Sequence, residues 1–242
     1  MAAAQAGRRN ALIPILIVVV AIALIAVVLA TRGGSTPTTE PAATPTAPSG
    51  VVDSAEQPTP PATVNVERRD PADPLAIGEL DAPVGIVMYS DFQCGFCALW
   101  TDQTLPAILP YVEAGEVRIE WRDIALFGPE SHRGALAAYA AGLQGAYLPF
   151  HEALFDGGDP PSPDQLSEDG LADVAAAVGL DLDTFRADLA SADVQAGVQA
   201  NLDEAAQLGV MSTPAFLING HPVSGAQPTP VFTEMIDAEL AG

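Results

Sequence analysis

Hydrophobic and polar positions divide the chain into three stretches with different patterns. Residues 11–30 carry no polar side chain, residues 31–63 carry almost no large apolar side chain, and from residue 64 onward short apolar runs alternate with helical spacing. At about 1.5 Å per residue, the first stretch makes a helix about 30 Å long, which matches the hydrocarbon core of a bilayer. The pattern predicts a transmembrane helix, a stem and a folded domain over residues 64–242.

The charges that flank the apolar stretch predict its orientation. Arg8 and Arg9 precede it and the single Arg32 follows it. This charge difference predicts that residues 1–10 lie in the cytoplasm as the N-terminus and that the folded domain lies outside the cell membrane. A cleaved signal peptide is the alternative, because residues 28–30 loosely fit a small-residue cleavage site. The apolar run is longer than the ~7–15 residues of a signal-peptide core, so an uncleaved single-pass anchor is favoured. Both alternatives export the domain.

Residues 31–63, between the anchor and the domain, are rich in Pro, Thr, Ser and Ala. Such a segment buries too little apolar surface to offset the entropy lost when a chain becomes ordered, so we expect a disordered stem. A flexible stem of this length spans about 35 Å, which would let the domain sample the space beside the membrane.

The remaining pattern predicts an α/β domain in which strands alternate with helices. We expect five short strands in a mixed sheet, and the Asn219-Gly220 pair is a hairpin signal between the last two. A helix over residues 96–113 should be kinked at Pro106, and a final helix over 231–240 follows Thr229-Pro230. The alanine-rich block 129–208 predicts a large helical insertion. The expected strands are residues 64–68, 84–89, 117–121, 215–218 and 221–223.

Charge narrows the choice of partners. The formal net charge is −22, and all of it lies beyond residue 70, because residues 1–70 hold five acids and five arginines. A domain this acidic repels nucleic acid and anionic lipid, so neither is expected as a partner. Such an acidic charge is typical of domains that must stay soluble in a high-solute or extracytoplasmic setting.

The two cysteines of the chain, Cys94 and Cys97, lie two residues apart where a predicted strand meets a predicted helix. A structural zinc site needs four ligands, and His132, His151 and His221 are too widely spaced along the chain to supply a pair, so metal binding is disfavoured. An inert structural disulfide is also disfavoured, because closing so short a loop gains almost nothing. Redox chemistry is the third alternative.

The surroundings favour redox chemistry. Cys94 would lie at the N-terminus of a helix that begins at about Phe96, where free N–H groups and the helix dipole stabilise an anion. Such a position lowers a thiol pKa from about 8.5 into a range of about 3.5–7.5. Cys97 lies one turn further along, where it can attack a mixed disulfide on Cys94. Gly95 leaves the Cys94 sulfur accessible, and Phe96 suits either a contact with an unfolded substrate or ordinary packing.

Two segments resemble one known family. VMYSDFQCGFC, residues 87–97, is similar to the active-site strand and helix start of the DsbA-like thioredoxin-fold oxidoreductases. LGVMSTPAFLING, residues 208–220, resembles the segment of that family that carries its threonine–cis-proline pair, here Thr213-Pro214. The resemblance covers about residues 64–240 and implies a thioredoxin-like fold. It places Thr213-Pro214 beside the cysteines, where the Thr213 backbone would meet an extended substrate.

The sequence departs from the family at two positions. Most relatives have proline where this chain has Gly95, and the strongly oxidising members have histidine where it has Phe96. Losing a potential hydrogen-bond donor should stabilise the Cys94 thiolate less. Our hypothesis is a disulfide less oxidising than the ~−120 mV of the DsbA type.

Other polar residues near the motif have structural alternatives. Asp91 matches an aspartate of the signature and is a candidate proton relay, although a turn or helix-cap role fits it equally well. Arg122 and Asp123 end the third strand and are expected to form an ordinary salt bridge. His151 is expected to be structural. We also expect four residues of the insertion to be core rather than a cofactor site: Tyr139, Leu143, Phe150 and Phe155.

Together these features predict an exported, membrane-tethered thiol–disulfide oxidoreductase with no cofactor or metal. Cys94 is the expected nucleophile and Cys97 the resolving thiol, and the redox-active disulfide joins them. The expected partners are unfolded or folding exported proteins with cysteines, and a membrane redox protein that recycles the disulfide. A disulfide reductase or isomerase is the alternative within this class. A non-catalytic peptide-binding module is the alternative outside it.

Overall fold

The computed structural model describes residues 63–242. The predicted membrane anchor and nearly all of the predicted stem lie outside this range. Within it, no helix is both long and apolar enough to cross a membrane.

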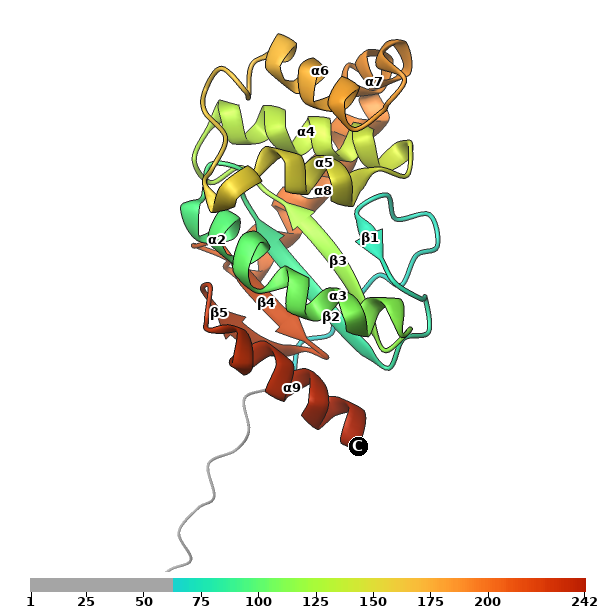
Figure 1. Cartoon of the computed structure of the whole chain (residues 1–242), viewed down its shortest axis with the longest axis vertical. Coiled ribbons are helices and arrows are strands. Elements are labelled where there is room, and N and C mark those ends of the chain that lie inside the picture. The colour runs from blue at the N-terminus through green and yellow to red at the C-terminus, as the bar shows by residue number, and fades with distance from the viewer. Residues whose placement is uncertain (1–62) are drawn as a thin grey trace, which may run out of the picture. The chain divides into compact units, whose positions relative to one another are not determined.

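A five-stranded sheet forms the centre of the domain, in the order β1-β3-β2-β4-β5 (Figure 1). Strands β2 and β3 are parallel, and the other neighbouring pairs are antiparallel, so the sheet is mixed as predicted. The Asn219-Gly220 hairpin is confirmed, with φ angles of 45° and 80° that suit a tight turn between two strands. The strands are β1 (Ala76–Ile77), β2 (Val84–Ser90), β3 (Val117–Asp123), β4 (Ala215–Ile218) and β5 (His221–Ser224).

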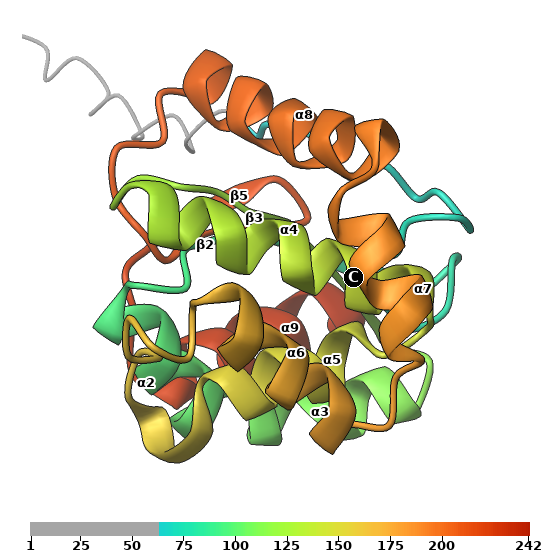
Figure 2. The same ribbon diagram turned by 90° about the horizontal axis from the view of Figure 1, so that it is seen from above.

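Every residue of β2 and β3 is buried, because helices cover both faces of the sheet. Alternate β2 residues such as Ile86 and Met88 pack with α2, α3 and α9. Val87 and Tyr89 point the other way and pack near Ala205 of α8. Figure 2 shows α8 on one side of the sheet and α3 and α9 on the other. These helices are α2 (Gly95–Gln103), α3 (Leu105–Glu113), α8 (Ala192–Leu208) and α9 (Thr229–Ala241).

The kink expected at Pro106 is a full break into two helices. Helix α2 ends at Gln103, Thr104 lies between the helices, and Pro106 falls in the first turn of α3, where its missing N–H costs no hydrogen bond. The last helix begins at Thr229 rather than after it, because Pro228 occupies the N-cap position.

The predicted helical insertion is confirmed, and side-chain caps divide it. Ser167, Asp181 and Ser191 each accept a hydrogen bond from the first turn of the helix that they precede. Gly209 ends α8 in the left-handed conformation. Figure 1 shows α4 to α7 gathered at one end of the sheet. The remaining helices are α4 (Pro129–Leu143), α5 (Tyr147–Leu154), α6 (Glu168–Ala177), α7 (Leu182–Leu189) and the short η1 (Asp156–Gly158).

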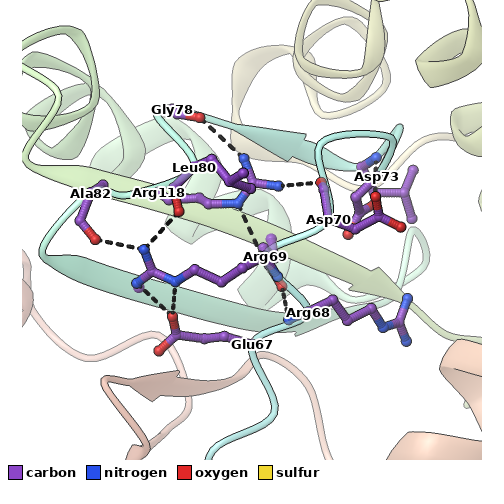
Figure 3. Close-up of polar contacts among 12 residues, drawn as sticks. Glu67, Arg68, Arg69, Asp70, Asp73, Gly78, Leu80, Ala82 and Arg118 are labelled. Atoms are coloured by element: carbon purple, nitrogen blue, oxygen red, sulfur yellow. Dashed lines mark hydrogen bonds and ion pairs between the residues drawn. The ribbon is translucent and has the colours of Figure 1, made fainter.

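The strand expected over residues 64–68 is wrong. Residues 63–70 form no strand. The N–H groups of Arg68 and Arg69 donate to the Glu120 carboxylate instead of to a neighbouring strand, and Arg69, directly after the expected strand, has a φ of 46°, outside the β region. The side chain of Arg69 holds this segment by donating to the carbonyls of Leu80 and Ala82 (Figure 3). The first strand is instead the two-residue β1, which is too short to leave a pattern in the sequence.

The core of the insertion differs from expectation at one position. Phe150 and Phe155 are buried and Tyr139 is partly buried, as predicted. Leu143 is 50% exposed, because it is the last residue of α4, where the helix ends.

Candidate active site

The turn between β2 and α2 carries both cysteines. The Cys94 N–H donates to the Asp91 carbonyl at 3.0 Å, and the N–H groups of Cys97 and Ala98 donate to the Cys94 carbonyl at 3.0 and 3.2 Å. Cys94 is therefore the N-cap of α2, with extended φ and ψ angles of −87° and 112°. The predicted placement of Cys94 at the start of the helix is confirmed.

Cys94 lies where its thiolate is stabilised. In its protonated form, Cys94 Sγ donates to the Thr213 carbonyl at 3.2 Å, a contact that favours the thiol. A hydrogen bond from the Cys97 thiol is the main cause that lowers the Cys94 pKa from 9.0 to about 6; the Thr213 side chain and the N–H groups at the helix start assist, and burial opposes. At neutral pH the reduced protein therefore holds Cys94 largely as a thiolate.

Cys97 has the opposite environment. It is fully buried, and burial together with the neighbouring Cys94 sulfur raises its pKa well above 9.0. In this structure both cysteines are free. Cys94 keeps 5% of its surface exposed and Cys97 keeps none. One sulfur is thus a thiolate at the edge of the surface, and the other is a protonated thiol one helical turn behind it, which is the asymmetry that disulfide exchange needs.

The predicted substrate-groove residues lie beside the nucleophile. The Thr213-Pro214 peptide is cis, and β4 begins directly after it and pairs with the end of β2. Thr213 is buried, and its Oγ1 has no hydrogen-bond partner among residues 63–242. That hydroxyl is placed to donate to a Cys94 thiolate, a role that the sequence did not suggest.

Asp91 is fully buried below the turn. Its carboxylate accepts hydrogen bonds from the N–H groups of Gln93, Leu126 and Phe127 and from the Ser131 hydroxyl. These contacts tie the active-site turn to the loop between β3 and α4. The proton-relay role suggested for Asp91 stays a prediction, and its observed contacts are those of a residue that holds a turn.

Exposed apolar side chains surround the nucleophile. Phe96 is 65% exposed, and Leu126 and Phe127 are exposed on the loop that Asp91 holds beside the turn. Met211, two residues before Thr213, is 87% exposed. We call Phe96, Leu126, Phe127 and Met211 the apolar rim.

The expected salt bridge between Arg122 and Asp123 is wrong, because adjacent residues of a strand point to opposite faces of the sheet. Arg122 pairs with Asp73, Glu120 and Glu204 on the α8 side. Asp123 lies on the cysteine side without a cation, and burial raises its pKa from 3.8 to about 7.

Sequence reasoning missed the polar residues that lie around Asp123. The Tyr147 hydroxyl donates to Asp123 Oδ2 at 2.9 Å and lies 3.2 Å from His151 Nδ1. The parity of Asp123 with the apolar β3 residues Ile119 and Trp121 was the one available signal, since it places the carboxylate on the core face.

Two further features bear on the kind of site. An apolar pocket of about 460 Å³ lies against β4 and β5, but neither cysteine lines it. Within residues 63–242, no three side chains of His, Cys, Asp or Glu gather where they could hold a metal ion.

Known proteins share this arrangement in part. The Thioredoxin family model matches residues 71–238. The probable disulfide bond formation protein D of Bacillus cereus is 27% identical over 151 residues, which cover 60% of this chain and 70% of that protein. The Na(+)/H(+) antiporter NhaA 3 of Salinispora tropica is 34% identical over 146 residues, which cover 59% of this chain but only 21% of the antiporter.

A solved structure shows the same fold. BdbD from Bacillus subtilis, in its oxidised form, superposes with a TM-score of 0.63 at 22% identity, and covers 69% of this chain and 93% of that structure. The family match spans more than half of the chain and includes both cysteines and the cis proline. The chain belongs to the DsbA-like family of thioredoxin-fold thiol–disulfide oxidoreductases.

Proposed function

We propose that this protein is a membrane-tethered, extracytoplasmic oxidase that transfers a Cys94–Cys97 disulfide to exported proteins. The opposite protonation of the two thiols is the observation that carries the proposal. A thiol pair whose reduced form is stabilised has an oxidising disulfide, and a Cys94 thiolate held at the helix start stabilises that reduced form. The name of the Bacillus cereus relative, a disulfide bond formation protein, supports the same direction.

The reaction follows from the different positions of the two sulfurs, since Cys94 is 5% exposed and Cys97 is fully buried. A substrate thiolate attacks Cys94 Sγ, the bond between the cysteines breaks, and Cys97 leaves with the bonding electrons and takes up a proton. The second substrate thiolate then attacks the substrate sulfur of the mixed disulfide, which forms the substrate disulfide and releases Cys94 as a thiolate. The substrate loses two electrons and the protein gains them. A low pKa makes Cys94 the better leaving group in the second step.

The apolar rim suits a substrate that is not yet folded. Its four side chains lie on three segments around Cys94, and unfolded exported proteins expose the apolar side chains that such a surface contacts. The Thr213 carbonyl, 3.2 Å from Cys94 Sγ, offers a backbone acceptor to an extended peptide. Phe96 belongs to this rim instead of supplying a histidine donor, so we expect a potential less oxidising than ~−120 mV.

The remaining parts of the proposal come from the sequence outside the described residues. The apolar stretch 11–30 would anchor the protein with its N-terminus in the cytoplasm. An oxidase that has given up its disulfide needs an acceptor for two electrons, and we propose a membrane redox protein in that role.

Trapping the mixed disulfide tests the proposal. Cys97→Ser removes the resolving thiol, so exported proteins should accumulate as adducts on Cys94 that run as reducible bands on non-reducing gels. Cys94→Ser is the matched control and should trap nothing. Absence of adducts from Cys97→Ser, with unchanged disulfide content of exported proteins, would favour a peptide-binding module. Thiol alkylation in living cells gives the direction: a mostly oxidised pair supports the oxidase, and a mostly reduced pair supports a reductase.

A further inference from the structure

Two residues of the apolar rim lie on a loop that the active-site turn holds in place. Loop 124–128 connects β3 to α4, and its Leu126 and Phe127 side chains are 43% and 55% exposed. Loops are usually the mobile parts of a fold, and apolar side chains are unfavourable in water. A free loop would turn these two side chains inward. Their exposure therefore requires a fixed backbone, which side chains of the turn and of α4 provide.

The Asp91 carboxylate binds the N–H groups of this loop. Its Oδ2 accepts from the Leu126 N–H at 2.7 Å and from the Phe127 N–H at 3.2 Å. Its Oδ1 accepts from the Gln93 N–H and from the Ser131 hydroxyl. A carboxylate offers about four lone-pair positions, so all of them are in use. Asp91 is fully buried, which makes each of these hydrogen bonds costly to lose.

Gln93 binds the same loop through its carbonyl. The Gln93 Nε2 donates to the Phe127 carbonyl at 3.2 Å and to Ser131 Oγ at 2.9 Å. Ser131 therefore accepts from Gln93 and donates to Asp91, and the three side chains form one connected network. The network binds both the N–H and the carbonyl of Phe127, while its ring stays exposed. We call Asp91, Gln93 and Ser131 the clasp.

The turn that supplies the clasp is itself fixed. Phe92, in the middle of the turn, is fully buried, and a Cβ at Gly134 of α4 would lie 3.0 Å from its ring. Where the loop begins, the Ile124 N–H donates to the Ser90 carbonyl at 2.8 Å. The active-site turn, the loop and the start of α4 thus form one connected unit, and Cys94 directly follows the turn.

The clasp holds the loop residues beside the nucleophile. Phe96 lies two residues after Cys94 and is 65% exposed. Leu126 and Phe127 continue this apolar surface on the other side of the turn, fixed relative to the sulfur. A surface that is ordered before binding loses less conformational entropy when a partner meets it. Glutathione has no apolar side chain, so it gains nothing from such a surface.

We propose that the clasp is a specificity determinant: it holds Leu126 and Phe127 ready to bind an apolar side chain near the reacting cysteine of an unfolded polypeptide. The inference rests on the proposed function, which supplies the disulfide. The surface is continuous with Cys94, so its occupant is the chain whose thiolate attacks that sulfur. Gln93 and Ser131 act through the loop and are therefore positioning residues.

A pair of peptides tests this specificity. Both are short, unfolded dithiols made otherwise of Gly and Ser, and they differ only in having Phe or Ser two residues from the first cysteine. Single-turnover reduction of the oxidised protein, over a range of peptide concentrations, gives the rate at saturation and the half-saturating concentration. We expect the wild type to reach half-saturation at an about tenfold lower concentration of the Phe peptide, with similar rates at saturation. Equal half-saturating concentrations would overturn the proposal.

Removing the donors of Gln93 should weaken this preference. Gln93→Met keeps the length of the side chain, so the advantage of the Phe peptide should fall to about twofold, while the rate with glutathione stays unchanged. Gln199→Met is the matched control, because Gln199 donates to Asp203 on the exposed surface of α8, and it should keep the full advantage. A full advantage in Gln93→Met, or an equal loss of rate with glutathione, would overturn the proposal.

Ser131→Ala interrupts the same network at α4, and it serves if Gln93→Met fails to fold. Because Gln93 and Ser131 share one network, the double variant should lose little more of the preference than the more affected single variant. Losses that multiply in the double variant would contradict a shared clasp.

Hydrogen exchange measures the clasp without any disulfide chemistry. The Leu126 and Phe127 amides donate to a buried carboxylate, so they should exchange slowly in the wild type and about tenfold faster in Gln93→Met and Ser131→Ala. Equal exchange rates in an active protein would overturn the clasp alone. Protected amides in a protein that exchanges no disulfide with either peptide or with glutathione would overturn the proposed function, and the specificity with it.

Discussion

Asp123 and Glu120 are buried carboxylates on the same strand, three residues apart, yet their surroundings differ in every respect except burial. Glu120 faces α8, where Arg118 and Arg122 and the N–H groups of the 68–69 segment all donate to it, and these donors lower its pKa to about 2 although burial opposes them. Asp123 faces the cysteines with one hydroxyl donor, and burial raises its pKa to about 7. The sheet thus separates a charged face from a face of adjustable protonation.

The two cysteines repeat this contrast at close range. Both lie in the same helical turn, but Cys94 has donors and a lowered pKa, whereas Cys97 is buried behind it with a raised pKa. The comparison teaches that burial alone does not decide the charge of a group in this domain. The number of donors aimed at the group decides it.

Removing the cation from the charged face should have the largest effect. Arg122→Met leaves Asp73, Glu120 and Glu204 without their shared partner inside the protein. We expect the free energy of unfolding to fall by about 3–5 kcal/mol, measured by urea denaturation. Arg133→Met is the matched control, because Arg133 forms an exposed pair with Glu130 and should cost less than about 1 kcal/mol. Equal losses in the two variants would contradict the contrast.

Neutralising the other face should stabilise the protein, in a pH-dependent way. The folded pKa of Asp123, about 7, lies above its ordinary 3.8, so the stability that this group contributes is present below pH 4 and is lost as the pH rises to 7. Asp123→Asn has no such loss. We expect its stability relative to the wild type to increase by about 4 kcal/mol between pH 4 and pH 8, from urea denaturation at each pH.

Glu120 should show the opposite sign. Its folded pKa of about 2 lies below its ordinary 4.5, so the stability that Glu120 contributes is present above pH 4.5 and is lost as the pH falls towards 2.

The Asp123 prediction has a clear contrary outcome. A constant difference in the free energy of unfolding between Asp123→Asn and the wild type at all pH values would mean that Asp123 titrates normally.

The number of hydrogen-bond donors near the Cys94 sulfur can be lowered by one. Thr213→Val keeps the shape of the side chain and removes the unpartnered hydroxyl beside the sulfur. We expect the midpoint of the Cys94 thiolate titration to rise above the wild-type value of about 6, corresponding to about 1 kcal/mol. Thr233→Val on α9 is the control and should leave the midpoint unchanged. An unchanged midpoint in Thr213→Val would mean that the Cys97 thiol and the helix start alone stabilise the Cys94 thiolate.

The smallest effect is expected at the helix start. Gly95 is the first residue of α2, the preceding Cys94 is already extended at a ψ of 112°, and a side chain at position 95 would meet open space. Gly95→Pro should therefore raise the free energy of unfolding by about 0.4–1 kcal/mol, because proline restricts the unfolded chain and fits the first helical turn. A loss of stability on chemical denaturation would show that the N–H of Gly95 has a partner.

Much of the fold could be predicted because its signals are local. The apolar runs of β2 and β4, the Asn219-Gly220 turn and the alternation in β3 each depend on neighbouring residues alone. The active-site cysteines were found for the same reason. The strand expected over residues 64–68 is absent, because their β-branched composition suits a strand while the actual partners of the Arg68 and Arg69 N–H groups are carboxylate oxygens of Glu120.

The rest of the site depends on contacts between distant parts of the chain. Tyr147 and His151 reach Asp123 and Thr101 only after α5 packs against β3 and α2, and no spacing in the sequence reports that packing. Asp91 and Asp123 illustrate the limit. Both are acids at strand ends, and only the structure shows that Asp91 accepts four hydrogen bonds whereas Asp123 is left almost alone.

The central claim is that the reduced protein holds one thiolate and one thiol at neutral pH. Ultraviolet absorbance of the thiolate, followed from pH 4 to pH 9 on the reduced chain with the oxidised chain as blank, measures this directly. The account predicts a single thiolate per molecule with a midpoint near 6, assigned to Cys94 by its loss in Cys94→Ser. Two thiols that titrate together near 9 would contradict it.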